Sequence, residues 1–342
     1  MGETLADLGE WELIRRLGAF APPGQFNDDA ALLPPRLDRT LVLNTDVLVE
    51  GIHFSDTTTE PADVGWRAAA ANLSDLAAMG CTEVVGLTVG LVAPATTPWS
   101  WVEGVYRGLT AALGHYGGVV LGGDCSGGSQ RLLAITALGL LGGGAGPIRR
   151  SDGLPGDQLV CTGPHGLSRL GLALLQSDAA GLAGLDSTLV QRAIQAHRRP
   201  IPRLDAVRML GGCRPAGQPW RVGGCDSSDG LAVAVATIAA ASGCAARLER
   251  QRLPLDPAMG GLPQAEGWCL GGGEDFELVL ALEPHWAEAL VSALPEATRI
   301  GTLLEGPAGE VCWADGTQWD ADEGAIKGYC HFKGTPPESG SD

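Results

Sequence analysis

Lysine is nearly missing from this chain, since only Lys327 and Lys333 are lysines among 23 Lys and Arg residues. No lysine therefore falls in a glycine-rich GxxxxGK[ST] loop, and a nucleotide site of that kind is excluded. Positive charge is scarce altogether, because 40 acidic residues leave a net charge of −17. This balance argues against nucleic acid and anionic membranes as partners, which require a basic face. Phosphorylated ligands stay open, because carboxylates can hold phosphates through Mg²⁺.

Several other patterns are missing too. The nine cysteines are scattered without a CxxC pair, so they suggest neither a zinc site nor a disulfide framework. Reduced cysteines in a cytoplasmic protein are the simplest interpretation. The N-terminus is charged and amphipathic, unlike a signal peptide, and no apolar run makes a convincing membrane span. The catalytic patterns GxSxG and HExxH, the kinase HRD and DFG triplets, and a GxGxxG after a strand do not occur.

The length of 342 residues and the hydrophobic content of 45% allow two domains with real cores. A stretch rich in glycine and proline at 142–157 marks a plausible boundary. We therefore expect an N-terminal domain at 1–145, a C-terminal α/β domain at 146–333 and a disordered tail at 334–342. Apolar periodicity predicts helices at 3–18, 66–80, 100–117, 168–178 and within 223–243, and strands at 41–46, 84–93, 119–124, 132–142, 158–163 and within 270–282.

Asp75 is the most informative single residue. It lies close to the apolar stripe of the predicted 66–80 helix, and Asn72 precedes it by three residues on the same face. A buried carboxylate is costly unless a cation or a metal pairs with it. The predicted strand 41–46 ends nearby in the triplet Asn44-Thr45-Asp46. A metal site is thus one interpretation, and the alternative is that Asp75 is solvated at the edge of the stripe or caps a neighbouring turn.

The stretch GGDCSGG at 122–128 is the second candidate. Its glycines let the backbone approach a ligand closely, which suits a loop that holds an anion or a metal-bound phosphate. A tight turn is the alternative. The repeated design favours a ligand, because the predicted strands 41–46 and 119–124 both end in an aspartate.

Two further acidic pairs could serve a ligand site, but each also has a purely structural explanation. Asp226 and Asp229 surround two serines where we expect a helix to begin. Helix capping explains one acid and one serine there, but not all four residues. Asp28 and Asp29 precede an apolar run and could begin a strand beside the site, although paired acids are also common as solvated turn residues.

The acids near predicted element ends form one set, namely Asp28, Asp29, Asp46, Asp75, Asp124, Asp226, Asp229 and Glu274. Hard divalent cations take oxygen ligands from carboxylates, and Mg²⁺ commonly shares them with phosphates. Several Mg²⁺ ions on a nucleotide would explain this acidic count in a chain with few lysines. Phosphoryl transfer would then need mostly positioning and charge neutralisation.

Eight motifs resemble those of one known family and occur in its order: NDDAALL, LNTDVLVEGIHF, NLSDLAAMG, GGDCSGG, RSDGLPGD, DSSDGL, GGGEDFEL and GYCHF. They make the chain similar to thiamine-monophosphate kinases from about residue 10 to residue 333. The resemblance implies an enzyme that uses ATP and Mg²⁺ to convert thiamine monophosphate to thiamine diphosphate. It also implies the two-domain α/β fold, with mixed sheets, of the aminoimidazole-ribonucleotide-synthetase-like superfamily, with N-terminal domains pairing into a homodimer.

The resemblance assigns site residues by motif. Several Mg²⁺ ions would be held by Asp29, Asn44, Thr45, Asp46, Asp75, Asp124, Asp226 and Asp229. ATP would contact Tyr106, Gly123, Asp124, Arg150 and Ser228, and the thiamine phosphate would meet His53, Glu274 and Tyr329. The catalytic residues would be Asp46, Asp124, Arg150 and Asp229, which clamp the charge during in-line transfer of the γ-phosphoryl group to the substrate phosphate. A monovalent cation is a further candidate cofactor.

The chain departs from the family pattern at four places. Asn27 and Asn44 replace a usual glycine and serine, and Cys330 replaces a usual aspartate. Cys125-Ser126-Gly127 stands where the family usually has Thr-Thr-Arg, which removes a hydroxyl and an arginine near the phosphates. No metal-ligand aspartate is missing. Without the resemblance, Arg150 would be interpreted as a surface arginine in a linker.

Two other functions are compatible with these motifs. One is a sister ATP-dependent synthetase of the same superfamily, although selenophosphate synthetases carry a reactive cysteine near the N-terminus and the first cysteine here is Cys81. The other is a non-catalytic nucleotide-binding homologue, for which the altered 125–128 stretch is the only support. A turnover assay separates these alternatives.

Overall fold

The computed structural model describes residues 2–23, 38–176, 182 and 184–316. Asp29, Tyr329 and the expected tail at 334–342 lie outside these residues. The helices are α1 (Leu5–Leu17), α2 (Pro61–Ala78), α3 (Trp99–Tyr116), α4 (Leu167–Leu175), α5 (Ser187–Arg198), α6 (Leu204–Gly212), α7 (Leu231–Ala241), α8 (Ala265–Gly271) and α9 (Pro284–Ala293). The strands are β1 (Leu41–Val49), β2 (Cys81–Ala93), β3 (Val119–Gly127), β4 (Leu132–Leu141), β5 (Gln158–Cys161), β6 (Gly223–Asp226), β7 (Ala245–Leu248), β8 (Leu278–Leu282), β9 (Thr298–Leu304) and β10 (Val311–Trp313).

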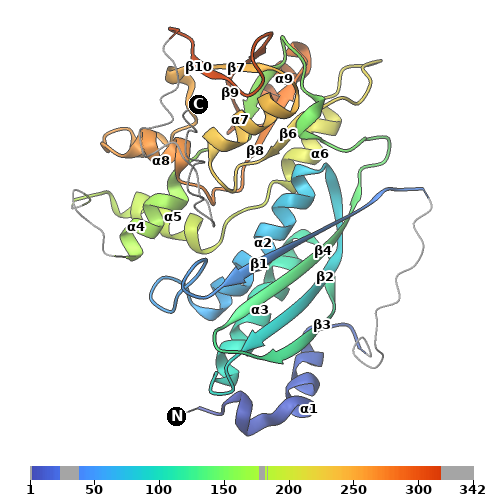
Figure 1. The fold of residues 1–342 in the computed structure, drawn as a ribbon, viewed down its shortest axis with the longest axis vertical. Helices are drawn as coiled ribbons and strands as arrows, with labels where there is room; N and C mark the ends of the chain where they lie inside the picture. The colour runs from blue at the N-terminus through green and yellow to red at the C-terminus, as the bar shows by residue number, and fades with distance from the viewer. Residues whose placement is uncertain (1, 24–37, 177–181, 183, 317–342) are drawn as a thin grey trace, which may run out of the picture.

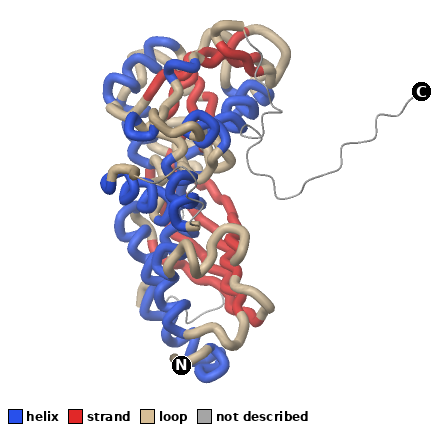
Figure 2. Tube along the Cα trace, turned by 90° about the vertical axis from the view of Figure 1, so that its left-hand side faces the viewer, coloured by secondary structure: helices blue, strands red, loops and turns tan. Residues whose placement is uncertain are grey.

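The first four strands form a sheet in the order β1-β4-β2-β3, in the lower half of Figure 1. Strand β4 pairs antiparallel with β1 and β2, whereas β2 and β3 are parallel. Helices α2 and α3 cover one face of this sheet, and Figure 2 shows no described helix on the opposite face. Exposure alternates along β1 as that arrangement requires, with Leu41, Leu43 and Val47 exposed on the open face.

Helices α2 and α3 pack unusually close because glycines lie at their contact. A Cβ atom on Gly65 would lie 1.9 Å from the carbonyl oxygen of Val105, and one on Gly108 would lie 1.8 Å from that of Ala62. No other residue fits at either position without moving a backbone. This close contact fixes α2 on the sheet and therefore fixes the polar residues of α2 relative to β1.

The remaining strands form a second sheet in the order β10-β7-β9-β5-β8-β6, in the upper half of Figure 1. The expected boundary at residue 145 falls between the two sheets, and its exact position stays a prediction. Hydrophobic packing continues across this junction, because one buried cluster includes Leu73 and Leu76 from α2 together with Leu278 and Leu280 from β8. The mixed α/β fold with two sheets confirms the predicted class.

Two expectations about local structure are wrong. The stretch 122–128 is not a loop, because β3 continues to Gly127 and pairs with β2 along that length. Asp46 and Asp124 consequently lie inside strands rather than at strand ends. The helix expected within 223–243 is confirmed as α7, and it is preceded by strand β6 and a turn that the pattern did not predict.

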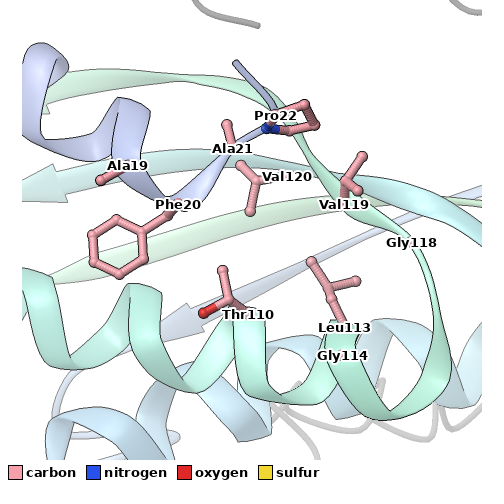
Figure 3. Close-up of a pocket in the computed structure, with 10 residues that line it drawn as sticks. All are labelled: Ala19, Phe20, Ala21, Pro22, Thr110, Leu113, Gly114, Gly118, Val119 and Val120. Carbon is pink, nitrogen blue, oxygen red and sulfur yellow. The ribbon is translucent and has the colours of Figure 1, made fainter.

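A cavity of about 400 Å³ lies between residues 19–22, α3 and the start of β3 (Figure 3). Its lining is mostly apolar and includes Phe20, Leu113 and Val120, with Thr110 as the polar side chain. The Thr110 hydroxyl donates to the carbonyl of Tyr106 at 2.8 Å. Among the described residues, no charged side chain lines this cavity, so its lining does not suit a phosphate group. Among the residues that the model describes, no helix is long and apolar enough to span a membrane.

Candidate active site

Four carboxylates from four segments gather where the two sheets meet. Asp46 comes from β1, Asp75 from α2, Asp226 from the end of β6 and Asp229 from the turn before α7. The alternation of exposure places Asp46 on the face of β1 that α2 covers. This carboxylate cluster therefore joins residues that are up to 183 positions apart in the sequence, from Asp46 to Asp229.

Two asparagines hold the N-terminal part of the carboxylate cluster in place. Asn44 donates its amide N–H to Asp75 at 2.8 Å and to the Oδ1 of Asn72 at 3.2 Å. The same Oδ1 accepts the backbone N–H of Asp46 at 3.2 Å, and the Asn72 amide donates to the Ala68 carbonyl at 2.9 Å. Asn72 is fully buried, so it fixes strand β1 against helix α2 at the level of the carboxylates.

Serine hydroxyls hold the C-terminal part. Ser74 of α2 donates to Asp226 at 2.8 Å across the junction between the halves of the chain, and Ser228 donates to its other oxygen at 3.1 Å. The turn closes with a bond from Gly230 N–H to the Ser227 carbonyl at 2.9 Å. The serines therefore orient Asp226 in addition to forming a turn before α7.

The pKa values show how strongly these carboxylates are confined. Burial raises the pKa of Asp75 from 3.8 to about 7, with further repulsion from Asp226 and Asp46, while Asn44 and Arg150 oppose the shift. Burial first and Asp229 second raise the pKa of Asp46. Burial also raises the pKa of Asp226, against the two serine hydroxyls that lower it. The cluster thus concentrates negative charge that either a bound proton or a metal cation can balance.

Arg150 is the cation that faces this cluster. It begins a 3-10 turn, Arg150–Asp152, whose preceding residue pairs with β6 through the bond from Gly224 N–H to the Arg149 carbonyl at 3.1 Å. The Arg150 carbonyl also accepts the Ser242 hydroxyl at 2.8 Å. The backbone at Arg150 is therefore anchored, and its exposed side chain is close enough to act on the charge of Asp75.

The residues present fit a divalent cation. The Oδ1 atom of Asn44 is buried and has no hydrogen-bond partner among the described residues, although the amide of the same side chain makes two bonds. Carboxylate and amide oxygens are the donors that Mg²⁺ takes in proteins. Within residues 2–23, 38–176, 182 and 184–316, no three His, Cys, Asp or Glu side chains close on a single point.

A second group of polar residues lies near the carboxylate cluster and contains His53 and Glu274. The Glu274 carboxylate accepts from Arg67 of α2 at 2.5 Å, and Arg67 also donates to the His53 carbonyl at 3.3 Å. The His53 Nδ1 accepts the backbone N–H of Val49 at 2.9 Å. Two of the three residues expected to meet the thiamine phosphate are therefore joined through one arginine.

Glu274 has a strained backbone. Its φ is 58°, a left-handed conformation that costs a non-glycine residue about 1 kcal/mol or more, and Phe276 has φ 53°. Tertiary bonds hold it there, because its N–H donates to the Ser228 carbonyl at 2.7 Å. The intervening Asp275 accepts the N–H groups of Gly166 and Ser168 at 2.7 and 3.1 Å. Strain kept by the surrounding structure is typical of a functional position.

The third expected group lies apart from the carboxylate cluster. Asp124 is opposite Gly90 in β2, Gly90 is opposite Ala134 in β4, and Ala134 is opposite Val47 in β1. Asp124 therefore shares the open face with Val47 and lies three strand spacings, about 14 Å, from β1. One Mg²⁺ ion, with ligands at about 2 Å, cannot touch both Asp46 and Asp124 of one chain.

Tyr106 and Gly123, which were expected to contact ATP, both lie near Asp124 in the structure. Tyr106 is buried in α3, 5.6 Å from the ring of Phe20, and burial raises the pKa of its hydroxyl, with a smaller effect from Cys125. A Cβ atom on Gly123 would lie 2.0 Å from the carbonyl oxygen of Val89, so the strand pairing itself requires this glycine. Their contacts with ATP stay predictions.

Thr45 points away from its neighbours in the sequence. Its hydroxyl lies 2.8 Å from that of Thr136 on the open face, whereas Asn44 and Asp46 face α2. Its part in metal binding stays a prediction, and its side chain is not directed at the carboxylate cluster.

Sequence reasoning missed Ser74 and Arg67, both of which are buried and reach the C-terminal half. They lie seven residues apart, two turns of α2, and so share one face of the helix. Polar residues at that spacing in an otherwise apolar helix are a signal that could have identified them.

Both halves of the chain match known protein families. The family model "AIR synthase related protein, N-terminal domain" matches residues 27–141, and the model of the C-terminal domain matches residues 155–314. A thiamine-monophosphate kinase of Prochlorococcus marinus is 48% identical over 317 residues, which covers 92% of this chain and 93% of that protein. The thiamine-monophosphate kinase of Synechococcus elongatus is 47% identical and covers 96% of this chain and 98% of its own length.

Solved structures agree with these matches. The thiamine-monophosphate kinase of Stenotrophomonas maltophilia superposes with a TM-score of 0.75 at 32% identity, covering 91% of this chain and 98% of its own. AaThiL, solved in complex with AMPPCP and TMP, superposes with a TM-score of 0.71 at 26% identity, covering 97% and 100%. The hydrogenase maturation protein HypE, in complex with ATP, reaches 0.70 at 19% identity over 90% and 93%, and this likeness shows the fold alone.

Proposed function

Because this chain belongs to the family of thiamine-monophosphate kinases, we propose that its carboxylate cluster, Arg150 and the pair His53–Glu274 together transfer the γ-phosphoryl group of ATP to thiamine monophosphate. The product is thiamine diphosphate. This assignment rests on the gathering of Asp46, Asp75 and Asp226, together with the buried, unpartnered side-chain oxygen of Asn44, whose amide group donates to Asp75.

Mg²⁺ would be held by the oxygens of Asn44, Asp46, Asp75, Asp226 and Asp229, with Asp29 as a further candidate outside the described residues. When bound, it neutralises charge on the phosphates during transfer. A monovalent cation is a second candidate, which replacement of potassium by a larger organic cation in the assay would test. ATP is the co-substrate, as in the family.

The chain's own residues position the reactants. The acceptor is a phosphate that is already anionic, so no strong general base is required. Arg150 lies opposite the carboxylates and supplies a cation for the phosphoryl oxygens that gain charge during transfer. The serines that hold Asp226, and Asn44, which donates to Asp75, keep these groups in place without reorganisation. We expect direct in-line transfer rather than a covalent intermediate on the protein.

We further propose that the active form is a homodimer. Leu41, Leu43 and Val47 expose an apolar strip on the face of the first sheet that no described helix covers (Figure 2). Among the described strands, β1 and β3 form the two opposite edges of this sheet. A second copy that pairs its β3 with β1 would bring the partner copy's Gly123–Asp124 stretch beside the strand that carries Asp46, and would remove the separation of three strand spacings within one chain.

A mixing experiment tests this composite site. Asp46→Asn and Asp124→Asn should each abolish activity in the separate proteins. After the two variants are dissociated and reassembled together, about a quarter of the sites would contain both native carboxylates, so about a quarter of the activity should return. No recovery in a dimer of confirmed exchange would place both residues in one chain's site and contradict the proposal.

The function itself is tested by one assay. Purified protein is incubated with ATP, Mg²⁺ and thiamine monophosphate, and ADP and thiamine diphosphate are quantified by chromatography. Equal amounts of both products support the kinase. ATP binding without product would favour the non-catalytic homologue, and product from another phosphorylated acceptor only would favour a sister synthetase.

The eight described cysteines are all free thiols. This supports the proposal of a reducing, cytoplasmic location.

A further inference from the structure

We infer that Arg67 is a positioning residue for the acceptor: it acts through Glu274 and His53 and determines how tightly the protein binds thiamine monophosphate. The inference rests on the proposed function and extends it to a residue that no motif identified. Arg67 lies in α2, eight residues before Asp75, and is only 3% exposed.

The contacts of Arg67 join three segments that are far apart in the sequence. One nitrogen of its guanidinium group donates to the carbonyl of His197 at the end of α5. The other donates to Glu274 at 2.5 Å and to the carbonyl of His53 at 3.3 Å. No lysine could make these bonds at the same time, because its ammonium group lacks the planar fork of the guanidinium.

Arg67 is also the cation that balances Glu274. The second carboxylate oxygen of Glu274 lies 3.7 Å from Nδ1 of His197. Burial, together with repulsion from Arg67, Arg198 and Arg169, lowers the pKa of His197 to about 3, so this histidine is neutral at pH 7. Among the described side chains in contact with Glu274, Arg67 alone therefore carries a positive charge.

The strain at Glu274 makes this support necessary. Its left-handed backbone leaves the side chain dependent on tertiary contacts for its direction, and the contact with Arg67 is the shortest of these. The carboxylate can attract the cationic thiazolium ring of the acceptor only while it keeps that direction. Loss of Arg67 should consequently affect the acceptor and leave the nucleotide, which Arg150 and Ser228 would meet, unaffected.

Steady-state kinetics with both substrates test the inference. Arg67→Met should raise the KM for thiamine monophosphate by about tenfold to a hundredfold and change the KM for ATP by less than about twofold. Arg67→Lys, which keeps the charge, should restore part of the affinity. The control is Arg199→Met, because Arg199 lies at the same junction and pairs with Asp63 at 2.6 Å without touching Glu274. Both KM values should stay near wild type in that control.

A double-mutant cycle shows whether Arg67 acts through Glu274. In a Glu274→Gln background, Arg67→Met should raise the KM for thiamine monophosphate by less than about threefold, since the group that it orients is already gone. The inference is overturned if the two substitutions raise the KM for thiamine monophosphate by factors that multiply in the double variant. It is also overturned if Arg67→Met raises the KM values for ATP and thiamine monophosphate equally. If Arg67→Met fails to fold, as judged by circular dichroism, the same cycle with Arg67→Lys decides. Absence of product from the wild type would refute the proposed function, whereas an active wild type with multiplying effects would refute only the role of Arg67.

Discussion

Asp75→Asn should make the protein more stable and inactive at the same time. The substitution removes one negative charge with little change in shape. The bond from the Asn44 amide, 2.8 Å long in the wild type, survives if the new amide oxygen accepts it. Activity should fall below detection, because Asp75 is central among the carboxylates that would hold Mg²⁺ and the phosphates.

The size of the stabilisation follows from the pKa of Asp75. The pKa is 3.8 in an unperturbed carboxyl and about 7 in the folded protein, because burial and the neighbouring carboxylates disfavour the charge. At pH 8 the wild type must ionise this group in an unfavourable place, which costs about 4 kcal/mol from a difference of about three pKa units. Since the amide side chain of the variant bears no such charge, we expect the free energy of unfolding without metal to rise by about 2 to 4 kcal/mol.

The difference in the free energy of unfolding between the variant and the wild type depends on pH. The folded pKa lies above the unfolded one, so the unfavourable term is absent below about pH 4 and complete above about pH 7. The stability of the variant relative to wild type should grow across that interval. Chemical denaturation in the presence of a chelator, at pH 4.5 and pH 8, measures both ends.

Asp63→Asn is the matched control in the same helix. Asp63 is buried but pairs with Arg199 at 2.6 Å, so removing its charge should lower stability rather than raise it. Equal responses of the two variants would refute the reasoning from charge repulsion. Turnover like wild type in Asp75→Asn would remove Asp75 from the mechanism.

Three further predictions concern other parts of the molecule. Burial lowers the pKa of His165 to about 4, so between pH 7 and pH 4 the unfolded wild type binds a proton that the folded state does not. The free energy of unfolding of His165→Gln, measured by denaturation, should therefore rise by about 2 to 3 kcal/mol relative to wild type as pH falls from 7 to 4. Mg²⁺ affinity, measured by calorimetry, should rise between pH 6 and pH 8, because the ion displaces a proton from Asp75; a flat profile would exclude this coupling. Leu43→Lys places a charge on a side chain that is 64% exposed on the open face, and light scattering should show dissociation of a dimer; an unchanged mass would exclude that face.

Much of the fold could be predicted from periodicity. Helix α2 covers the predicted 66–80 helix, and β1, β2 and β4 cover three predicted strands, because their apolar residues repeat at the spacing of a buried face. The family model matches confirm the superfamily that the motifs implied. Glycine was the main source of error, since Gly123 is required by strand packing against Val89 and not by a turn.

The candidate site could be predicted only in part. Asp46, Asp75 and Asp226 were identified because their motifs are local, and the structure brings these three together. Ser74 and Arg67 were missed: their spacing on α2 marks them as unusual, but the residues on which they act, Asp226 and Glu274, are more than 150 positions away. A single sequence does not show which face of α2 meets the second sheet, and the roles of both residues depend on that face.

The sequence motifs and the structure of one chain disagree about how close Asp124 lies to Asp46. A motif assigns both aspartates to one nucleotide site, yet the register of β1, β4, β2 and β3 places them three strands apart and on opposite faces. If the strand edges of two copies meet as proposed, the β3 of one chain lies beside the β1 of the other and the separation of three strands is removed, although the two side chains still leave the sheet on opposite faces. On that argument the apolar strip of Leu41, Leu43 and Val47 belongs to catalysis as much as to assembly, because a monomer would possess every site residue and no complete site.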